Sequence, residues 1–197
     1  MNYPSFYDDI PSIKVKDPLA DVLGAIENGE YEFTYLDVVK SAGHSCPTVM
    51  GAYLLTLEAL QKLYPDQRAI RGDIKVEFKE EMTEGVAGVI GNVISHITGA
   101  TSQSGFKGLG NKFVRHSLMF FHTQIHSSVR FTRIDTNQSV ELIYNPSSIP
   151  ANPSQQVLMQ KVLQEKASDD EKKELGTLWQ DRVQRIFENR KKVIHLL

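Results

Sequence analysis

Hydrophobic residues recur every three or four positions in three stretches of the chain, which is the period of an amphipathic helix. The first stretch follows Pro47 and the second runs from 86 to 99. Pro47 suits the first turn of a helix, and glycine commonly follows a helix end. In the third stretch Ser168 and Glu171 have the spacing of a capping box. The pattern therefore predicts two central helices and a helical C-terminal region.

Alternating apolar and polar residues between the two central helices predict a half-buried strand over 70–79. Three further runs, 114–122, 129–134 and 140–144, have the composition of strands joined by short connections. The order is helix, strand, helix and three strands. We therefore expect an α+β fold with two layers, in which both helices cover one face of a mixed sheet, plus a C-terminal helical extension.

The chain divides into three parts by composition. Residues 1–34 are expected to form a helical lead segment, because Asp17-Pro18 can open a short helix and Asn28-Gly29 can close it. Residues 35–147 hold the α+β domain. Residues 148–197 begin with a linker rich in proline and serine and continue as helices.

Composition and charge exclude several classes of function. The 197 residues are 41% hydrophobic and 23% charged, with a formal net charge of -2, which gives no strong field for nucleic acid or an anionic membrane. No apolar run approaches the roughly 20 residues of a membrane span. A single cysteine forms no disulfide within the chain, and the N-terminus carries no export signal, so we expect a cytoplasmic protein.

The segment Gly43-His44-Ser45-Cys46-Pro47 carries the most distinctive chemistry. If Pro47 is the first helical residue, Cys46 is the N-cap, where the helix dipole favours a thiolate. Residues two apart in an extended segment point to the same side, so His44 and Cys46 can converge on zinc or another divalent transition metal. His96 is the expected third ligand, on the helix face that also carries Asn92 and Ala100. An isolated histidine on such a face is also typical of a hydrogen-bonded core residue.

A loop with several glycines follows the second helix, from 100 to 111. Such loops let a backbone approach a ligand closely. Lys107 and Asn111 are expected to orient an anionic or carbonyl-bearing small molecule there.

These motifs together resemble the FmdE family, which takes its name from formylmethanofuran dehydrogenase. Members have a Gly-His-x-Cys-Pro opening to a helix and a later Gly-Cys-Thr followed by a loop of glycine and lysine, and the resemblance covers roughly residues 35–145. It implies an α+β domain that binds metal, usually zinc. The chain departs from the pattern at two positions: Ala42 stands where many members have a further histidine, and Ala100 stands where the Gly-Cys-Thr cysteine would be.

Three functions remain open from the sequence. The first is a zinc-binding protein, acting as a metal-dependent enzyme or as an accessory component of a larger complex. The second is a metal-free thiol enzyme or redox sensor, with Cys46 activated by the helix terminus and His44 as its base. The third is a non-catalytic module that pairs through its C-terminal helices, where Trp179 and Phe187 lie on an apolar stripe. A homodimer is expected under all three.

Overall fold

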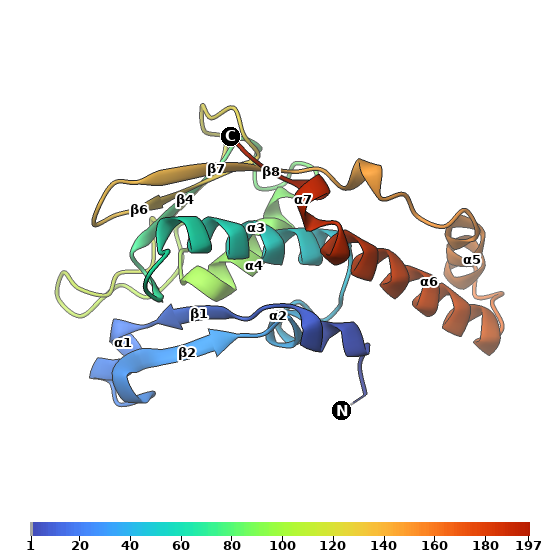
Figure 1. Ribbon diagram of the computed structural model, residues 1–197, viewed down its shortest axis with the longest axis horizontal. Coiled ribbons are helices and arrows are strands. Elements are labelled where there is room, and N and C mark those ends of the chain that lie inside the picture. The colour runs from blue at the N-terminus through green and yellow to red at the C-terminus, as the bar shows by residue number, and fades with distance from the viewer. Residues whose placement is uncertain (1) are drawn as a thin grey trace.

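The computed structural model describes residues 2–197 as two β-sheets with helices between them and a helical arm at one end (Figure 1). The larger sheet has five strands in the order β5-β4-β6-β7-β8. Its strands are β4 (Ile74–Phe78), β5 (Met119–Phe120), β6 (Val129–Arg133), β7 (Ser139–Tyr144) and β8 (Ile194–Leu196). Only the pairing of β4 with β5 is parallel, so the sheet is mixed as expected.

Helix α3 (Pro47–Leu63) lies between the two sheets and is buried along most of its length. Cys46 is its N-cap and Pro47 its first residue, as the sequence predicts. The helix packs on β7, where Gly51 makes room for the Tyr144 ring: a Cβ at this glycine would lie 2.3 Å from ring carbons. The Tyr144 hydroxyl donates to the carbonyl of Pro47 at 2.6 Å, which ties the start of the helix to the sheet.

The smaller sheet, in the order β2-β1-β3, covers the other side of the helices. Its strands are β1 (Ile13–Lys16), β2 (Glu30–Phe33) and β3 (Ala69–Ile70). The lead segment, expected to be helical, therefore also contains the two strands β1 and β2, and the short helix expected after Asp17-Pro18 lies between them. Its helical parts are short: the 3-10 turns η1 (Ser5–Asp9) and η2 (Glu27–Gly29), and α1 (Pro18–Val22). Alternation over only four residues in each strand is too short to stand out from the sequence.

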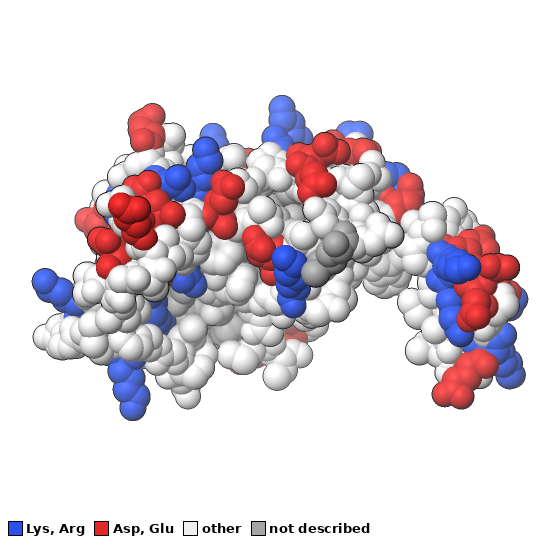
Figure 2. Space-filling view, turned by 90° about the horizontal axis from the view of Figure 1, so that it is seen from below, with Lys and Arg blue, Asp and Glu red and all other residues white. Residues whose placement is uncertain are grey.

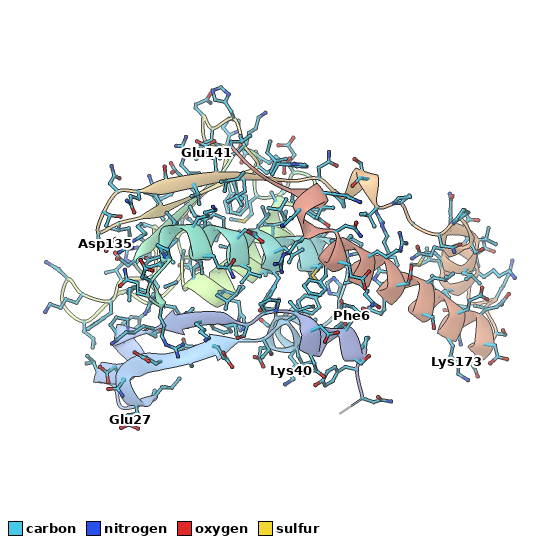
Figure 3. All side chains as sticks on the ribbon, in the orientation of Figure 1. Phe6, Glu27, Lys40, Asp135, Glu141 and Lys173 are labelled. Atoms are coloured by element: carbon cyan, nitrogen blue, oxygen red, sulfur yellow. The ribbon has the colours of Figure 1, made fainter. Side chains whose placement is uncertain are left out.

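Helices α2 (Tyr35–Ala42) and α4 (Ala87–Thr98) pack against each other and against α3. Thr34 and Asp37 form a capping box at the start of α2. Gly43 and Gly99 end the two helices in the left-handed conformation, with φ of 76° and 75°. Lys40, labelled in Figure 3, points away from the body on the outer side of α2. Val38 and Ala42 of α2 lie on the side that faces α4.

A buried carboxylate joins three distant parts of the chain. Asp17, whose side chain is 6% exposed, accepts from Arg71 Nη1 at 2.7 Å and from Arg115 Nη2 at 2.6 Å. It also caps α1 by accepting from the N–H of Leu19 at 3.0 Å. Burial raises the pKa of Asp17, but the guanidinium groups of Arg115 and Arg71 outweigh burial and hold that pKa below its usual value. The ion pairs fix the lead segment to the end of β3 and to the loop that precedes β5.

The C-terminal region forms a helical hairpin that extends beyond the body, with Lys173 near its outer end (Figures 1 and 3). It consists of α5 (Ser154–Leu163) and α6 (Asp169–Glu188), after the 3-10 turn η3 (Pro146–Ser148). Figure 2 shows side chains of both charge signs close together on the outer hairpin. Lys161 of α5 pairs with Glu171 of α6. The inner end of α6 packs on α3, and Val183 and Ile186 are fully buried there. The apolar stripe of α6, which includes Trp179 and Phe187, therefore packs against the body of the same chain.

The chain returns to the larger sheet after α7 (Arg190–Val193), because β8 pairs antiparallel with β7. This closing strand was not expected from the sequence. The run 114–122, expected to be one strand, contains only the two residues of β5. Positive φ values at Ser117 and His122 interrupt this run, since they are incompatible with extended backbone.

The α+β class, the mixed sheet and the C-terminal helical region are confirmed, with the smaller sheet as an additional layer. None of the helices formed by residues 2–197 is both long and apolar enough to pass through a membrane.

Removing the Asp17 carboxylate should destabilise the protein strongly. We expect Asp17→Ala to lower the free energy of unfolding by about 3–5 kcal/mol, because two largely buried guanidinium groups lose their partner. Urea denaturation measures the loss. Asp21→Asn, on the exposed side of α1, is the matched control and should change stability by less than about 0.5 kcal/mol. Equal losses in the two variants would contradict the role given to Asp17.

Candidate functional site

A pocket of about 210 Å³ lies between α2 and α4. Its apolar lining residues are Val38, Ala42, Val89 and Val93. Its polar lining residues are Ser41, His44, Asn92 and His96. Among the described residues that line it, none is Lys, Arg, Asp or Glu. A small ligand would thus meet apolar walls and a few neutral polar groups, as in many small-molecule sites.

His44 enters the pocket from the turn that ends α2. Its ring is exposed, and Nδ1 lies 3.0 Å from the carbonyl oxygen of Ala42. A carbonyl only accepts, so Nδ1 carries the proton and donates. In the neutral ring Nε2 then keeps its lone pair, which is the form that binds a metal or accepts from a ligand.

His96 reaches the same pocket from the last turn of α4. Its Nδ1 lies 3.3 Å from the Ser41 hydroxyl, and the edge of its ring packs against Phe33 with 5.0 Å between centroids. Burial lowers the pKa of His96, the charge of Arg71 lowers it further, and Asp37 opposes them. The surroundings of His96 therefore favour the neutral form of its ring. Two imidazoles held through Nδ1 thus line one pocket.

Asn92 and Ser41 are pocket residues that the sequence analysis did not propose. Asn92 lies one helical turn before His96 and is exposed at the pocket, where its amide offers both a donor and an acceptor. The spacing of four residues was a signal for Asn92. Ser41 had no such signal, because its contact with His96 joins residues 55 positions apart.

Cys46 faces a different environment. Its sulfur accepts from the N–H of Val49 at 3.4 Å, and the partly buried side chain packs against the hydrophobic core. Cys46 is not among the residues that line the pocket, and in the described chain no hydrogen bond joins it to His44. The neighbouring Ser45 carbonyl accepts from Trp179 Nε1 at 2.9 Å. This hydrogen bond holds the turn before α3 against α6. The sulfur acts as a helix cap here.

The glycine-containing loop does not contribute to this pocket. Lys107 and Asn111 are exposed and neither lines it. Ala100 is fully buried and is also absent from the lining, whereas Ala42 forms part of the wall. Of the two positions at which the chain departs from the FmdE pattern, residue 42 lines the pocket together with both histidines, and residue 100 does not.

The pocket offers few side chains that could bind a metal. Within residues 2–197 no three side chains of His, Cys, Asp or Glu are grouped so that they could hold an ion. A structural zinc site needs four protein ligands and a catalytic one usually has three. The two imidazole nitrogens fit an ion that takes its remaining ligands from water or a bound molecule, and they do not fit a closed structural site.

The sequence model described as "FmdE, Molybdenum formylmethanofuran dehydrogenase operon" matches residues 42–195. The chain belongs to the FmdE family. The FmdE match includes the turn with His44, both central helices and the larger sheet, and it continues through α5 and α6 almost to the C-terminus. Helices α5 and α6 are thus part of the matched FmdE region, and α6 contacts the turn at Ser45. No curated protein matches the chain.

The cap formed by Cys46 should contribute measurably to stability. Cys46→Ala removes the acceptor for the N–H of Val49, and we expect a loss of about 1 kcal/mol in the free energy of unfolding. Cys46→Ser keeps an acceptor at the N-cap and should lose less. Urea denaturation of both variants tests this, and a serine variant less stable than the alanine variant would exclude a capping role.

His96 should titrate below its ordinary pKa of about 6.5. NMR of the ring protons measures the midpoint, and Asp37→Asn should lower it further, because the carboxylate favours the protonated ring. The folded state binds this proton more weakly than the unfolded state does. The contribution of His96 to stability is thus fully present above pH 6.5 and is lost as the pH falls through the folded pKa. A midpoint at or above 6.5 would contradict the burial of the ring.

Proposed function

We propose that this FmdE-family protein binds a divalent transition metal, zinc first among them, in the pocket between α2 and α4. His44 and His96 are its protein ligands, through Nε2 of each ring. A small carbonyl-bearing molecule occupies the rest of the pocket and completes the coordination. Bound there, the metal would supply Lewis-acid chemistry toward the carbonyl group.

One observation carries the proposal: the two imidazoles line the same pocket, and each is engaged at Nδ1 by a neighbour in the last residues of α2. Histidines that bind metals commonly use one ring nitrogen for such an orienting hydrogen bond and the other for the metal. The lowered pKa of His96 favours the neutral ring, which is the form a metal binds.

The lining supports a small and largely uncharged ligand. Val38, Val89 and Val93 provide apolar walls, and the Asn92 amide can orient a polar group. About 210 Å³ is below the range of drug-sized pockets, so the ligand would be a small one.

The thiol-based alternative receives less support. It needs His44 as a base for Cys46, but the His44 ring donates to Ala42 and the sulfur accepts from Val49. The pairing module also receives less support, because Trp179 on its stripe donates to Ser45 of the same chain. A homodimer stays a prediction.

Zinc titration of the metal-free protein at neutral pH, followed by calorimetry, tests the proposal. We expect one ion per chain, and a loss of affinity of at least about tenfold in His44→Ala and in His96→Ala. Cys46→Ser should bind as the wild type does. His126→Ala, an exposed histidine away from the lining, is the matched control. Binding that depends on Cys46 and on neither histidine would defeat the proposal.

A third donor in the pocket wall should strengthen the site. Ala42 lines the same pocket as both histidines, so Ala42→His would bring another imidazole to that pocket. We expect this variant to bind zinc more tightly than the wild type, whereas Gln160→His, on the exposed side of α5, should not. Equal affinity in the two variants would show that the metal does not bind between α2 and α4.

A further inference from the structure

The last turn of α4, which carries His96, is held by residues that follow β3. The final four carbonyls of a helix have no partner within it. Arg71 Nη2 donates to the carbonyl of His96 at 3.0 Å, and Arg71 Nε donates to the carbonyl of Ile97 at 2.9 Å. The N–H of Gly72 donates to the carbonyl of Thr98 at 3.0 Å. Three consecutive carbonyls are thus bound by two neighbouring residues.

Arg71 also reaches the imidazole through an aromatic ring. Its guanidinium carbon lies 5.5 Å from the centroid of Phe33, in a cation–π arrangement, and the same Phe33 ring packs edge-on against His96. The arginine therefore restrains both the backbone and one side of the ring of His96. Ser41 restrains another side through Nδ1.

The guanidinium group of Arg71 is held by further partners outside α4. Arg71 Nη1 donates to Asp17 at 2.7 Å and to the Tyr31 hydroxyl at 2.9 Å. All three nitrogens of its guanidinium thus have partners, which come from α4, from β2 and from the residue that caps α1. The planar arginine guanidinium can make all of these hydrogen bonds at once, and a lysine ammonium at this position could not.

We propose that Arg71 is a positioning residue of the pocket between α2 and α4. It sets the direction of the His96 ring by binding the carbonyls of His96 and Ile97 and by stacking on Phe33. Arg71 does not line the pocket and touches no ligand there. It acts through His96 alone, so its loss should affect ligand binding at one of the two imidazoles. The inference rests on the proposed metal site between α2 and α4.

The protein contains a matched control for Arg71. Arg133 also caps a helix, since its Nη1 donates to the carbonyl of Leu63 at 2.9 Å, near the end of α3. It also lies over an aromatic ring, 4.1 Å from the centroid of Tyr64, and pairs with Asp135. Neither Arg133 nor its partners line the histidine pocket.

The test compares Arg71→Lys with Arg133→Lys by titration with cobalt(II), whose visible absorption reports its ligands. Both variants keep the charge and lose the planar guanidinium, and circular dichroism confirms that each is folded at the temperature of the titration. We expect the cobalt(II) dissociation constant to rise about tenfold in Arg71→Lys, as for other residues that orient a metal ligand, and less than about twofold in Arg133→Lys. Equal changes in the two variants, or no change in Arg71→Lys, would overturn the inference.

A second measurement needs no metal and separates this inference from the proposed function. The ring ¹⁵N resonances of His96 in the metal-free protein report its tautomer and hydrogen bonding. At a pH where the ring is neutral they should shift in Arg71→Lys and stay unchanged in Arg133→Lys, with His44 as an internal reference. If the wild type bound no cobalt(II), the proposed function would fail, and the positioning role would be decided by these resonances alone. Unchanged His96 resonances in Arg71→Lys would exclude that role.

Discussion

The buried carboxylate of Asp17 is the constraint on which the rest of the structure depends. It lies between Arg71 and Arg115, which are 54 and 98 residues away along the chain. A buried charge is tolerated only when it is paired and hydrogen-bonded, and here each charge fixes the others in place. Through this one group the lead segment, the smaller sheet and the loop before β5 are held against the end of α4. The position of His96 follows from it.

The pocket lies between two packed helices, and its two imidazoles come from the C-terminal ends of these helices. His44 follows the glycine that ends α2, and His96 lies in the last turn of α4. Because both rings are oriented by residues of the α2 terminus, a small movement of that helix would affect both imidazoles together. The FmdE match includes α6, which donates to the carbonyl of Ser45 in the turn before α3. Among the described residues that line the pocket, His44 and His96 are the side chains of the His, Cys, Asp and Glu types, and Ala42 completes the wall.

The features that the sequence predicts well depend on neighbouring residues. Pro47 and Cys46 mark the start of α3, Gly99 marks the end of α4, and Ser168 with Glu171 forms the capping box of α6. Each of these features depends on residues that are close together in the sequence, so the sequence alone predicts it. The motif at His44 also led to the FmdE family, which the match over residues 42–195 shows.

The rest depends on contacts between distant residues. The spacing of His44 and Cys46 did not show which partner the sulfur would have. In the structure the sulfur accepts from the N–H of Val49, as an N-cap side chain does. No local pattern relates Arg71 to the carbonyls of α4, and the short strands β1 and β8 form only because a sheet edge is present to pair with them. Lys107 and Asn111 lie outside the pocket between α2 and α4, and their expected role in orienting a ligand within their own loop stays a prediction.

An anomalous-scattering map at the zinc absorption edge, from crystals grown with zinc at neutral pH, tests the central claim most directly. The account predicts a peak between α2 and α4 in contact with the rings of His44 and His96, and none at Cys46. A peak centred on the sulfur of Cys46, or a pocket without zinc, would contradict it.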